Sequence, residues 1–244
     1  MDKLDAAAIA LPGVKVRVVA RCSSTNTVIF EQPIDGPVLL AAEEQSAGRG
    51  RRGRRWHSPR GAGITFSLAA PMRRPARELV ALPLVAGVAL ARALRALGVQ
   101  VALKWPNDLV VGEAKLGGIL VETRAGVAVI GAGINCHRVP GLEDALGRRV
   151  AFLERTDRNL VIRSLAQSLM VSLREFEMRG FEAARNDWQA MDAHAGLRLR
   201  VRLADGKVLS GMNSGLAADG ALRVLTRGGL REVRSGRVVS AGAA

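Results

Sequence analysis

Hydrophobic and polar positions change their period several times along the 244 residues, and each change predicts a different element. Residues 14–19 alternate valine with lysine and arginine, as a half-buried strand does. Residues 38–42 form a continuous apolar run typical of a buried strand, and residues 63–68 predict a third strand. Residues 75–97 place leucine and valine near helical spacing before Gly98, which predicts one long helix.

The middle of the chain predicts three strands joined by tight turns. The strands cover residues 108–111, 116–122 and 127–134, and the turns between them contain Gly112-Glu113 and Arg124-Ala125-Gly126. Turns of this length and composition join neighbouring antiparallel strands. We therefore expect an antiparallel meander.

The period changes again at Asp157. Leucines recur at helical spacing up to Gly180, and residues 181–193 continue with a second helical pattern, so we expect these helices to cover one face of the sheet. From Gly196 onward, short alternating runs are separated by turn dipeptides such as Asp205-Gly206. The pattern predicts a domain of residues 1–193 and a small separate β-barrel of residues 194–244.

Charge is distributed unevenly along the chain. The formal net charge is +14, and no acidic residue occurs between Glu44 and Glu78. That interval contains the arginines Arg49, Arg51, Arg52, Arg54, Arg55, Arg60, Arg73, Arg74 and Arg77. A second excess of arginine lies near the C-terminus. Such a chain is compatible with a nucleic-acid-binding module, although 3% aromatic residues and no tyrosine leave few side chains for stacking on bases.

Length and composition exclude several other classes. A chain with 48% hydrophobic residues buries a substantial core, so extended disorder is not expected. The N-terminus lacks the features of a signal peptide, and the longest apolar run, residues 79–91, is shorter than the ~20 residues that span a bilayer. We expect a cytoplasmic protein without a membrane segment. Cys22 and Cys136 lack zinc-ligand spacing with the histidines, which favours free, buried thiols.

The segment from Gln45 to Trp56 has the composition of an anion-binding loop. Glycines alternate with arginines after Ala47, and the run closes on one of only three tryptophans. Glycine lets backbone N–H groups turn toward a ligand, and arginine presents a fixed fork of donors that matches phosphate or carboxylate oxygens. The sequence therefore predicts that a negatively charged ligand binds here.

Two of the five lysines flank the predicted turn at residues 112–113. Lys104 opens Lys-Trp-Pro-Asn-Asp, and Lys115 opens Lys-Leu-Gly-Gly-Ile-Leu. Pairing of the two strands brings both ammonium groups toward one cleft, where a compact charge suits a phosphoryl oxygen. Elsewhere in the chain a lone lysine is better explained as a solvated surface charge.

Two further motifs are less specific. Residues 131–135, Gly-Ala-Gly-Ile-Asn, permit close backbone approach and end in an amide side chain, but a strand terminus explains them equally well. Residues 23–26, Ser-Ser-Thr-Asn, predict a helix N-cap whose hydroxyl groups are compatible with ligand binding. No serine–histidine triad is supported, so hydrolysis is not expected.

Taken together, these motifs resemble those of biotin protein ligases. The matching segments are residues 24–26, 45–59, 104–108, 115–122 and 131–135, in the family's order, and the resemblance spans roughly residues 15–240. It implies an α+β fold: a class II synthetase-like biotin/lipoate ligase catalytic domain with a mixed sheet and flanking helices, followed by an SH3-like β-barrel. Family members that act as repressors carry an N-terminal winged helix-turn-helix, whereas this sequence begins almost directly at the catalytic domain. The resemblance thus implies a ligase without operator binding.

The resemblance also implies a two-step reaction and roles for individual residues. Biotin's carboxylate attacks the α-phosphorus of ATP to give biotinyl-5′-AMP and pyrophosphate, and a lysine of a biotin carboxyl carrier domain then takes the biotinyl group. Biotin is expected to bind to Ser24, Thr25, Gln45, Gly48, Arg49, Arg51, Lys115 and Gly118. ATP is expected to bind to Trp56, Lys104, Asn107, Lys115 and Asn135. The catalytic residues are expected to be Lys115, Arg49, Arg51 and Asp108, with Asp108 orienting or deprotonating the incoming lysine.

Magnesium is expected to accompany ATP through phosphate oxygens, without a dedicated protein metal site. Two other functions stay open at this stage. The first is lipoate ligation or octanoyl transfer, performed by enzymes that resemble the same fold, and the second is the basic nucleic-acid-binding module. The sequence is compatible with either a monomer or a homodimer.

Overall fold

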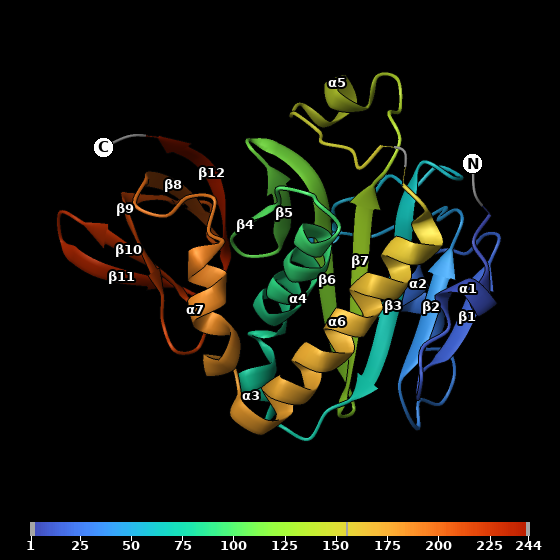
Figure 1. The fold of residues 1–244 in the computed structure, drawn as a ribbon. Coiled ribbons are helices and arrows are strands. Elements are labelled where there is room, and N and C mark those ends of the chain that lie inside the picture. Colours follow the sequence, from blue (N-terminus) through green and yellow to red (C-terminus); the bar gives the residue numbers. More distant parts are fainter. Residues whose placement is uncertain (1–2, 155, 243–244) are drawn as a thin grey trace.

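The computed structural model describes residues 3–154 and 156–242, and within them the strands form a seven-stranded and a five-stranded sheet (Figure 1). The larger sheet has the order β1-β2-β3-β7-β6-β5-β4. Its strands are β1 (Lys15–Val19), β2 (Val38–Ala42), β3 (Gly63–Pro71), β4 (Ala102–Lys104), β5 (Asp108–Val111), β6 (Ala114–Arg124) and β7 (Val127–Asn135). β1 and β2 run parallel and the other neighbours run antiparallel, so the sheet is mixed, as predicted.

The meander predicted for residues 108–134 is confirmed as β5, β6 and β7. β7, in the interior of the sheet, is buried along most of its length, whereas β6 mixes buried and half-buried residues and ends exposed. Residues 102–104 were not predicted as a strand, because three residues are too few to show a period. The backbone of residues 191–193 covers the outer edge of β4: the Leu103 amide donates to the Met191 carbonyl at 2.7 Å and the Ala193 amide donates to the Leu103 carbonyl at 2.8 Å.

Helices pack on the larger sheet and between the two sheets (Figure 1). They are α1 (Ala6–Ile9), α2 (Thr25–Ile29), α3 (Ala76–Leu79), α4 (Leu82–Ala96), α5 (Leu142–Leu146), α6 (Arg158–Arg179) and α7 (Glu182–Ala190), with a 3₁₀ turn at Arg51–Gly53. α4 packs on β6 and α6 on β3, and α7 packs against α4, α6 and β9 of the smaller sheet. The prediction of helices over one sheet face is therefore confirmed for α6, whereas α7 lies between the sheets. None of the described helices combines the length and hydropathy needed to cross a membrane.

The single helix predicted for residues 75–97 is wrong, because the segment forms two helices, α3 and α4. α4 begins at Leu82 with Pro83 in its first turn. Proline has no N–H to donate and clashes with the preceding turn, so it is accommodated only at the start of a helix. The start of α6 follows the expected pattern, since the Asp157 side chain accepts from the amides of Asn159 and Leu160.

The C-terminal sheet is SH3-like but open. Its strands are β8 (Arg198–Leu203), β9 (Val208–Leu216), β10 (Leu222–Thr226), β11 (Gly229–Val233) and β12 (Gly236–Gly242), in the order β11-β10-β9-β8-β12. The predicted SH3-like fold is confirmed, but in the part of the chain that the structure describes β11 and β12 form opposite edges and do not pair, so the predicted barrel is an open sheet. Alternation and turn residues predict the hairpins, whereas closure depends on strand tilt and stagger, which they do not encode.

The inner face of the C-terminal sheet shares its core with the larger sheet. Leu199, Val201 and Val224 are fully buried in the same cluster as Leu103 and Trp105. The Trp105 indole N–H donates to the Gly220 carbonyl at 3.3 Å. The two sheets are thus held together by a common apolar interior.

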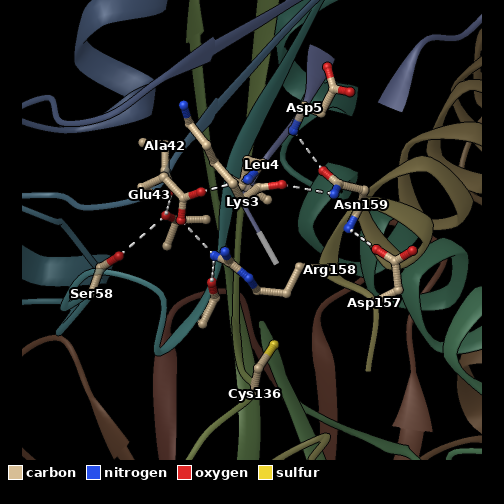
Figure 2. A network of polar contacts seen from close by, with 12 residues as sticks. Lys3, Leu4, Asp5, Ala42, Glu43, Ser58, Cys136, Asp157, Arg158 and Asn159 are labelled. Atoms are coloured by element: carbon tan, nitrogen blue, oxygen red, sulfur yellow. Dashed lines mark hydrogen bonds and ion pairs between the residues drawn. The ribbon is translucent and has the colours of Figure 1, made fainter. Parts of the chain in front are cut away.

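A buried ion pair and its hydrogen bonds join three segments that are distant in the sequence (Figure 2). The Arg158 guanidinium at the start of α6 donates to Glu43, just after β2, at 2.8 Å, and the two side chains are 2% and 7% exposed. The other oxygen of Glu43 accepts from the Leu4 amide at 2.6 Å. Burial alone raises the pKa of Glu43, but the hydrogen bonds from Arg158 and Leu4 and the charge of Arg158 lower it overall.

The two cysteines lie apart and free, as predicted. Cys136 is buried after β7, and burial raises the pKa of its thiol to about 11. Cys22 is half-buried, and burial also raises its pKa. A thiol kept neutral in this way is a poor nucleophile, so neither cysteine is prepared for covalent chemistry.

Candidate active site

A cleft of about 540 Å³ gathers the predicted site segments. Its walls come from the start of α2, the Gly-Arg loop, the β4–β5 turn, β6, β7, α5 and β12. The segments that were separated in the sequence therefore meet in one place. Uncharged polar side chains cluster around the first turn of α2, and several of the cations cluster around Asp108; we call these two groups the uncharged end and the cationic end of the cleft.

The uncharged end is built around the first turn of α2. The side-chain oxygen of Gln45 accepts from the Thr25 amide at 2.8 Å and from the Thr25 hydroxyl at 3.1 Å. Ser67 of β3 donates to Thr25, or to Asn26 at 2.6 Å. Ser24 is the N-cap residue, as predicted, but its side chain makes no capping bond; the amide of the first helical residue, Thr25, donates to Gln45. Ser24 instead lines the cleft.

Asn26 and Glu122 form a support that the sequence did not reveal. The Asn26 amide donates to Glu122 at 2.8 Å and to the Leu120 carbonyl at 3.2 Å. Glu122 in turn accepts from the Arg49 guanidinium at 2.8 Å and 3.0 Å. A side chain at Gly131 would collide with Asn26. Asn26 was predicted as part of a helix cap and of a matching motif but was given no role of its own, and its contact with β6 lies 96 positions away, beyond any local pattern.

The Gly-Arg loop folds back on itself at the mouth of the cleft. Arg49 and Arg51 line the cleft, whereas Gly48 does not. Gly48 serves the loop instead: its carbonyl accepts from the Trp56 amide at 2.8 Å, and a Cβ at this position would lie 2.5 Å from the Trp56 carbonyl. Arg51 donates to Asn107 at 3.4 Å. Burial, followed by the charge of Arg52, lowers the pKa of Arg51.

Lys104 and Lys115 both line the cleft, as their positions predicted. The Lys115 ammonium forms an ion pair with Asp108, and the side chains are 14% and 23% exposed. Burial lowers the pKa of Lys115, and Asp108 opposes this effect. Burial likewise lowers the pKa of Lys104. Gly118 permits this packing, because a Cβ there would lie 3.1 Å from the Lys115 ammonium.

The remaining residues predicted to bind ATP differ in whether they line the cleft. Asn107 and Trp56 line the cleft, and the Trp56 ring packs so closely on Gly133 that any side chain there would collide with the indole. Asn135 does not line the main cleft. Its amide donates to the Lys115 carbonyl at 3.2 Å, in a small adjoining cavity, so it contacts the backbone of the cleft wall rather than the open space.

Two cleft arginines come from segments that the sequence did not connect with the site. Arg148 lies in a segment that runs beside Lys115: the Lys115 amide donates to the Arg149 carbonyl at 3.1 Å, and the Ala151 amide donates to the Lys115 carbonyl at 2.9 Å. Arg237 comes from β12 of the C-terminal sheet. Neither lies in a motif, so only the tertiary fold could reveal them.

The cationic end has a large excess of positive charge. Among the described residues that line the cleft, one carboxylate, Asp108, faces eight cations. The cations are Arg49, Arg51, Arg54, Arg55, Lys104, Lys115, Arg148 and Arg237. This arrangement suits a ligand with several negative charges, such as a triphosphate. The described residues contain no group of three or more His, Cys, Asp or Glu side chains placed to hold a metal ion.

Comparison with known proteins identifies the family. The sequence model of the biotin/lipoate A/B protein ligase family matches residues 18–138. The bifunctional ligase/repressor BirA of Escherichia coli is 34% identical over 224 residues, which are 87% of this chain and 70% of that protein. The biotin--[acetyl-CoA-carboxylase] ligase of Mycobacterium tuberculosis is 30% identical over 91% of this chain and 87% of its own length. The chain belongs to the biotin protein ligase family.

Solved structures agree with this assignment. The biotin protein ligase from Aquifex aeolicus, in complex with biotin and ATP, superposes with a TM-score of 0.81 at 26% identity and covers 94% of this chain and 99% of that one. The Helicobacter pylori biotin acetyl coenzyme A carboxylase synthetase, with bound biotinylated ATP, gives a TM-score of 0.67 at 27% identity over 90% and 99% of the two chains. The predicted family, ligase fold and enzyme class are confirmed.

Proposed function

We propose that this biotin protein ligase forms biotinyl-5′-AMP from biotin and ATP and transfers the biotinyl group to a lysine of a biotin carboxyl carrier domain. One observation carries the proposal: a single cleft joins an uncharged polar end to a strongly cationic end. The first suits a neutral ureido ring and the second suits a carboxylate and a triphosphate. The named biotin and ATP complex of the Aquifex aeolicus relative supports the same pair of ligands.

At the uncharged end, Ser24, Thr25 and Gln45 bind the ureido ring. Their hydroxyl and amide groups donate and accept without placing a charge beside a neutral ligand. Gln45 already contacts the Thr25 amide, so the binding groups are oriented before the ligand arrives. Gly118 gives the ligand access to the backbone, and Gly48 allows the loop to close.

At the cationic end, Lys115, Arg49 and Arg51 hold the reacting groups of the first step. A carboxylate oxygen of biotin forms a bond to the α-phosphorus, and the bond from that phosphorus to the bridging oxygen breaks, so pyrophosphate leaves. Lys115 stabilises the negative charge that accumulates on the oxygens around phosphorus. Such a donor in a water-poor site contributes about 10²–10³ in rate.

The nucleotide is positioned by residues of the Gly-Arg loop and of the β4–β5 turn. We place adenine beside the Trp56 ring and assign Asn107 and Lys104 to the ribose and phosphate groups. Asn135 acts indirectly, because its contact with the Lys115 carbonyl holds the strand that carries the lysine.

In the second step, the carrier lysine attacks the biotinyl carbonyl. A bond from nitrogen to carbon forms, the bond from carbon to the adenylate oxygen breaks, and AMP leaves. The lysine must lose a proton to attack, and Asp108 lies in the cleft as an acceptor or orienting group. Its ion pair with Lys115 holds it there before the ligands bind.

Magnesium enters this scheme only with the nucleotide. Asp108, the one carboxylate among the described cleft residues, pairs with Lys115, and Glu122 pairs with Arg49. The described residues therefore fit a Mg²⁺ ion held mainly by phosphate oxygens rather than by a protein cage. We assign no step to it.

We also propose that the chain divides into a catalytic domain of residues 1–193 and a C-terminal domain of residues 194–244. The support is the change from one sheet to the other between α7 and β8.

The purified protein tests the function directly. With biotin, ATP and Mg²⁺ we expect biotin-dependent pyrophosphate release, followed by transfer of labelled biotin to the lysine of an added apo carrier domain. Activity with lipoate or octanoate in place of biotin would keep the fold and change the substrate. No pyrophosphate release with biotin, lipoate or octanoate would overturn the proposal.

A further inference from the structure

Four arginines lie in a row on the outer face of the C-terminal sheet. Arg198, Arg200 and Arg202 alternate with buried residues on β8, so all three point away from the core. Arg202 is paired across the strands with Arg237 of β12, and directly opposite residues share a face. We call these four residues the arginine row.

The arginine row has no acidic partners in the part of the chain that the structure describes. None of its members forms an ion pair, whereas the nearby carboxylates Asp219 and Glu232 both contact Arg234. Like charges directly opposite each other destabilise a strand pair, so Arg202 beside Arg237 does not help the fold. The fold therefore does not account for the row.

The surroundings of the row are uncharged. The residues paired with β8 on the β9 side are Val208, Ser210 and Met212, and those paired with Arg200 and Arg198 on β12 are Ser240 and Gly242. The three β8 arginines span about 14 Å, at about 3.4 Å per strand residue. The result is a narrow basic strip flanked by small or neutral side chains.

The strip begins at the active site. Arg237 both belongs to the row and lines the cleft. A macromolecule lying along β8 therefore has one end at the place where the carrier lysine must enter. This continuity connects the row with the second step of the reaction rather than with the first.

We propose that the arginine row docks an acidic face of the carrier domain beside the cleft. The inference rests on the proposed function, because it identifies how the acceptor protein is recognised. Guanidinium forks match carboxylates in geometry and charge, and complementary charges raise the association rate of two proteins. A single-stranded nucleic acid fits less well, because residues 194–244 contain no phenylalanine, tryptophan or tyrosine to stack on bases.

Charge reversal at the far end of the row tests the proposal. Arg198 and Arg200 are exposed and do not line the cleft, so the double variant Arg198→Glu/Arg200→Glu leaves the first step intact. We expect the KM for an isolated apo carrier domain of acetyl-CoA carboxylase to rise about tenfold or more. The kcat at saturating carrier and the biotin-dependent pyrophosphate release remain at the parent values. The KM of the parent also rises more steeply with salt than that of the variant.

The matched control is Arg163→Glu/Arg174→Glu. Both arginines are exposed on α6, form no ion pair among the described residues and do not line the cleft, so the net charge changes equally. We expect this variant to keep the parent KM. An unchanged KM in the row variant, or an equal rise in both variants, would overturn the docking surface. If the parent protein itself shows no biotin-dependent pyrophosphate release, the result counts against the proposed function rather than against the docking surface.

Two further measurements complete the design. If the glutamate variant does not reach the parent thermal midpoint, Arg198→Gln/Arg200→Gln carries the same KM test without introducing negative charge. Binding of a 20-base-pair DNA duplex is measured in parallel. DNA binding that the row variant loses, together with an unchanged carrier KM, would replace the protein partner with a nucleic acid and overturn the proposal.

Discussion

Two ion pairs, Glu43–Arg158 and Asp108–Lys115, differ in how far the fold closes them off from solvent. Glu43 and Arg158 are 7% and 2% exposed, and the carboxylate has a second partner in the Leu4 amide. Asp108 and Lys115 are 23% and 14% exposed and face a cleft of about 540 Å³. The first pair is closed off by the fold, whereas the second is open to a ligand.

The difference shows how one interaction type serves structure and chemistry. A fully buried pair is stable only while both charges stay together, because separation leaves a charge without water or a partner. A pair beside a cleft can exchange its partner for a ligand of the same charge. Lys115 can therefore pass from Asp108 to a phosphate or carboxylate, while Arg158 stays buried against Glu43.

The largest expected effect comes from breaking the closed pair. Arg158→Met leaves Glu43 buried without its cation, and we expect a loss of about 3–5 kcal/mol in the free energy of unfolding. Denaturant titration measures the loss. The control Arg138→Met breaks an exposed pair with Glu154 and is expected to cost less than about 1 kcal/mol. Equal costs for the two variants would remove the distinction between buried and exposed pairs.

Breaking the open pair is expected to affect the reaction rather than the fold. Lys115→Ala removes the donor for the charge that develops around phosphorus, so the first step slows by about 10²–10³. Chemically supplied biotinyl-5′-AMP remains partly usable, because that step has already occurred. Pyrophosphate release and carrier labelling measure the two steps separately.

An exposed lysine–aspartate pair gives the matched control. Lys207 pairs with Asp205, and their side chains are 82% and 53% exposed. Lys207→Ala is expected to leave both steps unchanged. Normal pyrophosphate release by the Lys115 variant would contradict its assigned role.

The next expected effect concerns the Gly-Arg loop, whose Arg51 also lines the open cleft. Arg51→Ala removes a charged donor expected to contact the adenylate, and such a bond is worth about 1.5–3 kcal/mol. We expect biotinyl-5′-AMP to escape into solution about ten- to a hundredfold faster. Trapping of released adenylate measures this. Arg52→Ala is the control, because Arg52 lies in the same loop without lining the cleft. Equal retention by the Arg51 variant and the parent would refute the role of the loop.

The smallest effect concerns acid stability. The folded state lowers the pKa of Glu43 below its usual 4.5, so its contribution to stability is complete above pH 4.5 and is lost as the pH falls through the folded-state pKa. Glu43→Gln removes this titration. The difference in unfolding free energy between parent and variant therefore shrinks below pH 4.5. Denaturation curves from pH 6 to pH 3 measure it, and a constant difference would be inconsistent with the lowered pKa.

Local patterns predicted the elements that depend on local chemistry. The meander of β5, β6 and β7 followed from alternation and turn residues, and α6 followed from a leucine period with Asp157 before it. The break between α3 and α4 was missed although Pro83 was visible, because the apolar spacing continues across it.

The candidate site was predictable where its residues share a motif. Thr25, Gln45, Lys104 and Lys115 meet in the cleft. Arg148 and Arg237 were not identified, because their relation to the cleft depends on how an irregular segment and a second sheet pack. The open C-terminal sheet was missed for a similar reason, since closure is a property of the whole sheet.

The backbone bonds between β4 and residues 191–193 have a consequence for handling the protein. A strand at the edge of a sheet offers unpaired N–H and C=O groups on which other chains can add, and covering that edge prevents aggregation. Here the protection comes from the short linker after α7. A truncation that ends at Ala190 would remove that protection along with the C-terminal sheet. It would yield a protein prone to strand-to-strand association, whereas one that keeps residues 191–193 retains the cover.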